Sequence, residues 1–448
     1  MRARIPRGDT FWVRAVLGVG LILLLTSVSL GLPRSFKPDV RCPQGPTASK
    51  TQSKLWFNDG TWWGILFNGS SEEYHIYRYA GDGGTWQDTG TLVDARNASR
   101  ADALWDDGHL YVVSAGTESD VDGHDARFAR YSYDPSTARY SLDKGFPVKI
   151  AEGGTEAITV ARDATGELWA TYMKNVGDGL RDVYVTHTLG GDDTRWARPF
   201  TPSLPGITGN DDDVSAVVAF GSEVGLAWSN QNDESGDAGF YFAVHENGDS
   251  QDAWRPNNPV MGSSMANDHL NVKADSEGRV YMALKNRRDR INRKPDAPYS
   301  MLWVLDQNGR WTSHVFGTVE EAHTRSLVLI DEEQEELYMF ASSPTCTGGK
   351  VYYKRTPLDD ISFEPGRGEL FMQSDDGTSI GDSSSTKQEI DSTMGAVVVA
   401  SNKAKDYYYN AIDVEEGEKR FGDGVRVDTD VPSADDPKET GAFDRGVG

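Results

Sequence analysis

The sequence predicts an all-β protein, a β-propeller of seven four-stranded blades, and three observations lead to this fold class. Seven hairpin-like stretches recur along the chain, an aromatic-rich run follows each of them, and six of the units then reach an aromatic residue at even spacing. Four antiparallel strands repeated at roughly 40–60 residues are the sequence pattern of a propeller blade. Six blades remain an alternative if one hairpin belongs to a neighbouring blade.

The clearest hairpin is residues 267–286, which read NDHLNVKADSEGRVYMALKN. Apolar and polar residues alternate on both sides of a turn at residues 275–278, and this pattern predicts two antiparallel strands. Related hairpins occupy residues 54–67, 102–115, 156–173, 213–230, 324–342 and 387–401. Each predicts the first two strands of one blade.

Third and fourth strands follow from the aromatic residues. The third runs are residues 74–79, 126–133, 182–188, 239–245, 299–305, 350–356 and 406–412. The fourth runs begin at Trp86, Tyr140, Trp196, Trp254, Trp311 and Phe363, spaced by 54, 56, 58, 57 and 52 residues. We interpret these rings as packing between blades. Blade 7 lacks such a residue, so its fourth strand is expected from the segment before blade 1 or from residues 425–428.

Charge and repetition limit the protein class. The 448 residues carry 45 Lys and Arg against 69 Asp and Glu, a net charge of −24, which argues against nucleic-acid binding because a broad basic surface is missing. A single blade cannot bury both faces, so residues 51–430 are expected to form one propeller domain. Residues 431–448 are expected to be a disordered acidic tail. We expect a monomer.

The N-terminus predicts export. Arg2, Arg4, Arg7 and Arg14 precede an apolar run of 18 residues from Ala15 to Leu32. Residues 1–34 are therefore a signal peptide or a signal-anchor helix, with 35–50 as a lead-in segment. The propeller is expected to be secreted or on the cell surface, and to meet a membrane only through this N-terminal segment. Asn68-Gly69-Ser70 and Asn97-Ala98-Ser99 are glycosylation sequons on predicted loops.

Two cysteines, Cys42 and Cys346, predict a disulfide in an exported protein, with two free thiols as the alternative. Neither has the Cys/His spacing of a zinc site. Asp211, Asp212 and Asp213 are a candidate Ca²⁺ site, although three adjacent Asp more often form a solvated turn. No cofactor is expected.

The starts of the first strands converge on one rim of a propeller's central channel, and this chain places charged groups there in every blade. The candidate catalytic residues are Asp102, Glu156, Asp213, Asp268, His269 and His323. The candidate substrate-binding residues are Lys54, Arg100, Asn271, Lys273, Arg325, Lys387 and Gln388. The alternative for the same residues is structural, because channel-lining polar groups also bridge blades and satisfy buried backbone atoms.

Two chemistries fit this rim. Facing carboxylates act as acid and base or nucleophile in glycoside hydrolysis, with a separation of about 5–5.5 Å for retention and about 6.5–9.5 Å for inversion. In a polysaccharide lyase a cation neutralises a uronate carboxylate while a histidine or tyrosine removes the acidified C5 proton, a route for His269 or His323. The sequence does not choose between them.

Three turns resemble the S-x-D-x-G-x-T-W motif of secreted, sialidase-like β-propellers with BNR or Asp-box repeats. They are residues 82–86 (DGGTW), 249–254 (DSQDAW) and 306–311 (DQNGRW). Residues 99–102 (SRAD), 212–217 (DDVSAV), 268–275 (DHLNVKAD), 323–325 (HTR) and 385–388 (STKQ) are also similar to segments of exported bacterial propeller proteins. Sialidases hold the substrate carboxylate with three arginines, and only Arg100 and Arg325 occupy the expected rim here.

The resemblance and the rim together predict a propeller that acts on a polysaccharide or glycoconjugate, as a glycoside hydrolase or a polysaccharide lyase. The alternative is a non-catalytic glycan- or protein-binding propeller at the cell surface.

Overall fold

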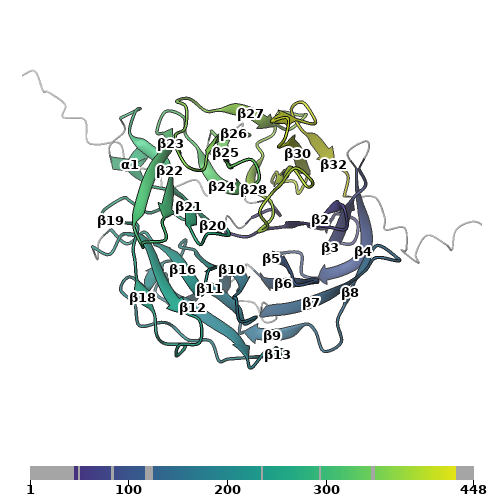
Figure 1. Cartoon of the computed structure of the whole chain (residues 1–448), viewed down its shortest axis with the longest axis horizontal. Coiled ribbons are helices and arrows are strands. Elements are labelled where there is room, and N and C mark those ends of the chain that lie inside the picture. Colours follow the sequence, from purple (N-terminus) through teal and green to yellow (C-terminus); the bar gives the residue numbers. More distant parts are fainter. Residues whose placement is uncertain are drawn as a thin grey trace, which may run out of the picture. The chain divides into compact units, whose positions relative to one another are not determined.

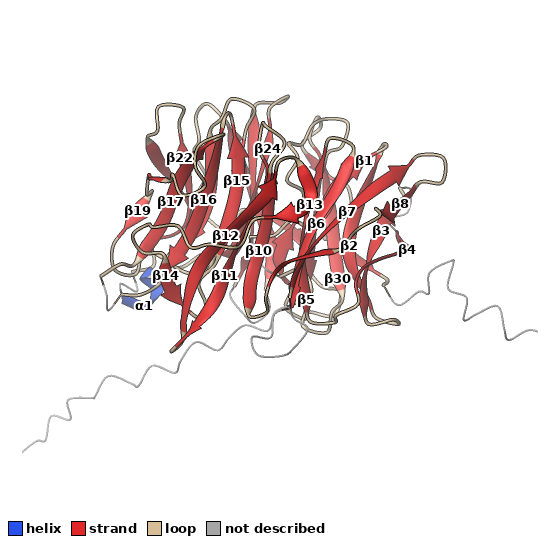
Figure 2. Cartoon of the chain, turned by 90° about the horizontal axis from the view of Figure 1, so that it is seen from below, coloured by secondary structure: helices blue, strands red, loops and turns tan. Residues whose placement is uncertain are grey.

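The computed structural model describes residues 45–48, 51–81, 85–116, 125–233, 236–291, 294–344 and 349–429. These residues form seven antiparallel sheets of four or five strands. The sheets stand around a common centre like blades (Figure 1), and from the side their strands run between two loop-bearing faces (Figure 2). The predicted fold class, an all-β propeller with seven blades, is confirmed.

Each blade is built from consecutive strands, ordered from the centre outward. Blade 1 contains β1 (Leu55–Asn58), β2 (Thr61–Asn68), β3 (Glu73–Tyr79) and β4 (Trp86–Asp94). Blade 2 contains β5 (Ser99–Asp106), β6 (His109–Gly116), β7 (Ala126–Asp134), β8 (Arg139–Leu142) and β9 (Val148–Ala151). Blade 3 contains β10 (Thr155–Arg162), β11 (Leu168–Gly177), β12 (Leu180–Leu189), β13 (Asp192–Trp196) and β14 (Thr208–Asn210).

The remaining blades follow the same order. Blade 4 contains β15 (Ser215–Phe220), β16 (Glu223–Asn230), β17 (Gly239–Glu246), β18 (Arg255–Pro256) and β19 (Val260–Met261). Blade 5 contains β20 (Leu270–Ala274), β21 (Val280–Lys285), the short helix α1 (Arg288–Ile291), β22 (Pro298–Leu305) and β23 (Trp311–Thr318). Blade 6 contains β24 (Thr324–Asp331), β25 (Glu336–Ser343), β26 (Lys350–Pro357) and β27 (Glu369–Met372). Blade 7 contains β28 (Gly381–Ser384), β29 (Ala396–Ser401), β30 (Tyr407–Asp413), β31 (Glu418–Lys419) and β32 (Val425–Val427).

The inner hairpins of blades 1 and 2 show how local sequence sets the register. Asp59-Gly60 and Asp107-Gly108 are two-residue loops with positive φ at all four positions. Positive φ at both central residues is the type I′ turn, whose twist matches that of the strands it joins. It pairs Asn58 with Thr61 and Asp106 with His109.

Aromatic rings join successive blades. Each residue predicted to begin a fourth run packs against a ring of the preceding blade, at centroid distances of 4.9–5.9 Å: Tyr140 on Trp56, Trp196 on Phe128, Trp254 on Trp169, Trp311 on Phe242, and Phe363 on Phe316. Trp86 of blade 1 packs in the same way on Tyr409 of blade 7, at 5.9 Å. The repeated aromatic residue is therefore the wedge between blades, and the Trp86 contact closes the ring.

Blade 7 differs from its prediction. Its first strand is β28, not the start of the predicted hairpin at residue 387; Gly381 pairs with Ser401 and Ser384 with Val399. Of the two expected sources of a fourth strand, the C-terminal one is correct, because β32 pairs with β30. The segment before blade 1 instead contacts this blade through Thr47, whose amide donates to the Ser401 hydroxyl (3.1 Å). Where β1 begins, the amides of Lys54 and Leu55 both donate to the Ser385 carbonyl (3.1 and 3.0 Å).

Several predictions fall outside the described residues. Cys42 and Cys346 both do, so the disulfide stays a prediction, as do the N-terminal segment 1–34 and the tail. Among the residues that the structure describes, no helix has the length and apolar character needed to cross a membrane.

Candidate functional site

The site is at the end of the central channel where the inner strands begin, which we call the upper mouth. Three of these strands open with a register shift, in β10, β24 and β28. At each shift a non-glycine residue has positive φ: Ala157 (53°), Arg325 (56°) and Asp382 (54°). Bulges re-aim side chains and are common beside active sites, and each such residue costs about 1–3 kcal/mol. The backbone therefore directs Arg325 and Asp382 out of the strand alternation.

Arg325 and Asp382 form a buried ion pair, with 2.6 Å between Nε and Oδ1. Burial opposes the charge of the Arg325 guanidinium, but Asp382, followed by Asp268 and Asp212, raises its pKa above the ordinary value. These carboxylates come from blades 7, 5 and 4. Charged groups from four blades, blade 6 with Arg325 itself included, therefore interact at this point of the channel.

His269 lies next to this pair and is held on both sides. Its Nδ1 is 2.8 Å from Oδ1 of Asp268 and also contacts Oδ1 of Asn267, while its Nε2 is 3.0 Å from the Thr324 hydroxyl. Because both neighbours of Nδ1 are acceptors, the proton of the neutral ring belongs on Nδ1. The Nε2 atom then carries the lone pair and accepts the hydrogen bond of the Thr324 hydroxyl.

A cation lies beside the imidazole. The Lys285 ammonium is 3.5 Å from the Thr324 hydroxyl that contacts His269, and 5.0 Å from the centre of the Tyr299 ring. Lys285 ends β21 and Tyr299 is in β22, so the second and third strands of blade 5 supply them. Neither was predicted.

A small pocket opens beside Arg325. It has a volume of about 70 Å³ and is lined by side chains of blades 6 and 7, among them Thr324, Arg325, Ser342, Asp382, Asn402 and Lys403. Its size suits one planar charged group rather than a sugar ring.

Below the upper mouth, residues 52–54 and 385–388 bridge the inner strands, and we call them the channel plug. Asp102 anchors it: the buried carboxylate accepts from the amides of Ser53 (2.7 Å) and Val160 (2.8 Å) and from the Lys387 ammonium (2.5 Å). Every polar contact of Asp102 in this set joins blade 2 to the plug or to blade 3. Its position is that of a structural anchor.

The other predicted lysines and amides also have partners inside the channel or between blades. The Lys54 ammonium donates to Gln52 (2.9 Å) and to the Ala101 carbonyl, and that of Lys273 donates to the Thr386 carbonyl. Gln388 exchanges two hydrogen bonds with the backbone of Phe57 (2.8 and 3.1 Å). Asn271 accepts from the Val328 amide at 3.2 Å, which ties blade 5 to blade 6.

Asp213 and Glu156 have assigned partners too. The fully buried Asp213 carboxylate accepts from Ser229 (2.7 Å) and the amides of Asn210 (2.7 Å) and Gln231 (3.1 Å), and burial raises its pKa to about 6. Glu156 is 3.2 Å from Arg181. Among the described residues no three His, Cys, Asp or Glu come together as a metal site.

Arg100 and His323 contact other groups than His269 does. Arg100 donates to the Tyr74 hydroxyl (3.2 Å) and the Ser99 carbonyl (2.9 Å) at blade 1. His323 is buried between blades 5 and 6, with Nε2 3.0 Å from the Arg367 carbonyl and its ring 4.7 Å from that of Phe316. Burial lowers its pKa to about 4. The two histidines therefore do not share a site.

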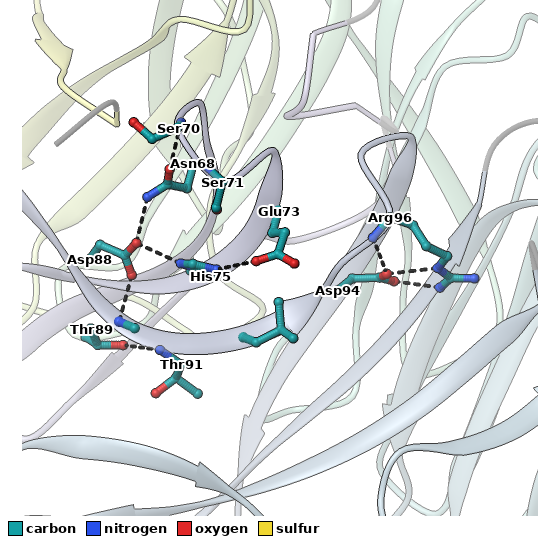
Figure 3. A network of polar contacts seen from close by, with 12 residues as sticks. Asn68, Ser70, Ser71, Glu73, His75, Asp88, Thr89, Thr91, Asp94 and Arg96 are labelled. Atoms are coloured by element: carbon teal, nitrogen blue, oxygen red, sulfur yellow. Dashed lines mark hydrogen bonds and ion pairs between the residues drawn. The ribbon is translucent and has the colours of Figure 1, made fainter. Parts of the chain in front are cut away.

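A separate polar network lies on blade 1 (Figure 3). His75 contacts Asp88 (2.7 Å) and Glu73 (3.4 Å), and Asp88 also accepts from the side chain of Asn68 (2.8 Å). Burial opposes protonation of His75, but Asp88 and Glu73 raise its pKa overall. The first sequon asparagine, Asn68, is thus buried and held as a donor, whereas Asn97 of the second is exposed.

Comparison with known proteins gives fold-level relatives. No protein-family model matches the chain, and no curated protein matches it. Among solved structures, a polysaccharide lyase of the ulvan lyase family PL25 has 12% identity, covers 80% of this chain and 91% of its own, and gives a TM-score of 0.53. A structure of the same family bound to -[GlcA(1-4)Rha3S]- has 11% identity, covers 81% of this chain and 92% of its own, and gives a TM-score of 0.50. The Hadza microbial sialidase Hz136 has 10% identity, covers 69% of this chain and 66% of its own, and gives a TM-score of 0.41.

At these identities the likeness shows the fold alone. The resemblance to sialidase-like propellers inferred from the sequence is confirmed at that level, as a shared β-propeller fold.

Proposed function

We propose that this propeller acts on an acidic polysaccharide at the upper mouth and cleaves it by β-elimination. The observation that carries the proposal is the imidazole of His269, oriented by Asp268 and linked through the Thr324 hydroxyl to the Lys285 ammonium. Its Nδ1 faces Asp268 at 2.8 Å, and Lys285 shares the Thr324 hydroxyl with its Nε2. A base and a cation within one substrate group's reach are what uronate elimination needs.

In this mechanism the uronate carboxylate binds to Lys285 and Arg325, which neutralise the charge that develops at C5. Nε2 of His269 removes the C5 proton, the C4–C5 double bond forms, and the C4–O bond breaks. The departing oxygen takes up a proton, for which we propose the Tyr299 phenol. Asp268 stabilises the imidazolium produced at His269, as a carboxylate does for a general base.

Hydrolysis by a carboxylate pair has less support. Asp102 and Asp213 are fully buried, and their oxygens accept from backbone amides, so neither presents a carboxyl group to a sugar. The solved polysaccharide lyase structure bound to the uronate-containing -[GlcA(1-4)Rha3S]- supports elimination over hydrolysis.

The test uses the soluble chain with the sulfated glucuronate–rhamnose polymer and a panel of other uronate polymers, reading absorbance near 232 nm and new reducing ends. Wild-type protein is expected to raise both signals on at least one polymer. His269→Ala and Lys285→Met are expected to lower the rate at least 100-fold, the usual size of a general acid–base contribution. The matched control is His109→Asn, at the opposite end of blade 2, which should keep the wild-type rate. Reducing ends without absorbance would refute elimination.

A non-catalytic binding role is the second candidate, and paired charges at the mouth favour it. Arg325 is bound to Asp382 at 2.6 Å and Glu156 to Arg181 at 3.2 Å. If this role is correct, the chain is retained on an immobilised acidic polymer with no product, and Arg325→Met weakens the retention.

The same proposal includes an extracytoplasmic location, because residues 1–34 have the pattern of an export signal. Expression of the full chain followed by fractionation is expected to find the propeller outside the cytoplasm, and replacing the four N-terminal arginines is expected to reduce export. Accumulation of the unaltered chain in the cytoplasm would contradict the location.

A further inference from the structure

A second cavity lies on the other side of the channel plug, and we call it the lower chamber. Its volume is about 270 Å³, and it is lined by the second halves of the inner strands of blades 2 to 5 and by the plug. Apolar walls come from residues such as Leu104, Trp105, Ala161, Val217 and Val272. The plug separates this chamber from the upper mouth, so the site of the proposed lyase activity does not include it.

Cations gather at the inner end of the chamber. Lys273 and Lys387 both line it. Arg162, nearer the strand ends, is paired with Asp106 at 3.1 Å and Asp107 at 3.2 Å, which leaves the lysines as the charge to be balanced.

Asp102 is shared among several amines. It pairs with Lys387 at 2.5 Å and acts on both Lys54 and Lys273 through its charge. Asp102 therefore acts on three amines inside the channel, and Asp382 acts on Lys54 as well. A buried excess of positive charge is costly, and it is relieved either when a lysine loses its proton or when a further anion binds.

We propose that the lower chamber binds a small organic anion, a monocarboxylate with an apolar body, with its charged group between Lys273 and Lys387. The carboxylate completes the charge balance of the plug, and the apolar body packs against Trp105, Val217 and Val272. A concave, mostly apolar cavity with a few convergent polar groups is the usual form of a small-molecule site.

The chamber gives binding a defined pH dependence. Burial lowers the pKa of Lys273 to about 7, repulsion by Lys387 adds to this, and attraction by Asp102 opposes it. A bound carboxylate stabilises the ammonium form, so binding takes up a proton when the free lysine is neutral. The affinity is then expected to be constant below pH 7 and to fall towards tenfold per pH unit above it.

Calorimetric titration of the full chain with benzoate tests the proposal, and benzamide, which has the same shape without the charge, is the matched probe. Benzoate is expected to bind at pH 6.5, to bind at least tenfold more weakly at pH 8.5, and to raise the melting temperature. Benzamide is expected not to bind at either pH and not to raise the melting temperature. Lys273→Met should abolish benzoate binding. Lys149→Met, which removes an exposed lysine of blade 2, should leave it unchanged.

A second variant guards against misfolding of the first. Ala219→Trp keeps both lysines but fills the chamber from the half-buried wall of blade 4. It is expected to retain the wild-type circular dichroism spectrum and lose benzoate binding. Benzoate binding that survives in both folded variants, or no binding to wild-type protein at either pH, would overturn the inference. The result does not depend on lyase activity, because the upper mouth is unchanged in both variants.

Discussion

Replacing Asp102 by Asn tests whether this carboxylate is an anchor of the ring or a group free for chemistry. In the structure it has no exposed surface and accepts from Ser53, Val160 and Lys387 at 2.5–2.8 Å. The substitution keeps the side chain's shape but puts an amide NH₂ where a donor already points. At least one donor loses its acceptor, and the Lys387 ammonium loses its counter-charge.

The expected cost follows from these contacts. Breaking a buried ion pair by removing one partner costs about 3–5 kcal/mol, and an unsatisfied buried donor alone costs about 1–3 kcal/mol. We therefore expect Asp102→Asn to lower the free energy of unfolding by about 3–5 kcal/mol. Equilibrium unfolding in urea measures this change from the midpoint at constant m-value.

A double-mutant cycle with Lys387→Met isolates the ion pair. The double variant is expected to be more stable than the sum of the single changes implies, by about 1–3 kcal/mol, because residues in contact do not act additively. A loss below about 1 kcal/mol for Asp102→Asn would refute the anchoring role and return Asp102 to the list of catalytic carboxylates.

Three further predictions concern other parts of the ring. Trp86→Ala should lower the free energy of unfolding by about 3–5 kcal/mol, since the buried ring closes blade 1 on Tyr409, while Leu92→Ala on the same strand, 45% exposed, should change it by less than about 0.5 kcal/mol. Burial lowers the pKa of His323 to about 4 in the folded protein, against about 6.5 in the unfolded chain. The free energy of unfolding should therefore fall by about 3 kcal/mol as the pH drops from 6.5 to 4, because the unfolded chain takes up a proton first. Urea unfolding of His323→Leu should lack this part of the pH dependence. In a glycosylating host Asn97 should carry a glycan and Asn68 should not, so mass spectrometry should show a glycan lost in Asn97→Gln and unchanged in Asn68→Gln.

The sequence predicts the ring because the features that build it are local and repeated. Hairpin alternation and Asp-Gly turns depend on neighbours in the chain, and the aromatic wedge recurs because every blade meets the one before it. β28 escaped this reasoning: its four residues, GDSS, have no apolar alternation, so the pattern favoured residue 387. Asp382, the partner of Arg325, was missed with it.

The site is harder to predict because bulges break the period of two. Without a bulge His323 and Arg325 would share a face, but the register shift between Thr324 and Leu327 turns Arg325 towards Asp382 while His323 packs between blades. Lys285 and Tyr299 were missed because only first strands were considered. The sequence could have indicated them only through the hairpin register, which places the end of β21, with Lys285, and the start of β22, with Tyr299, beside the start of β20, next to His269.

The contacts that close the ring also divide the channel. Residues 52–54 come from the start of the propeller and residues 385–388 from its last blade, and they meet at Asp102 and Ser385. A substitution that weakens the contacts of Asp102 or Ser385 should therefore change the lower chamber more than the upper mouth, because His269 and Thr324 belong to blades 5 and 6 and contact each other directly. In Asp102→Asn, benzoate affinity is expected to change because Lys387 loses its fixed partner, whereas turnover at His269 should persist at temperatures where the variant stays folded. Equal loss of both would mean that the plug supports the mouth as well, and that the two sites are coupled through it.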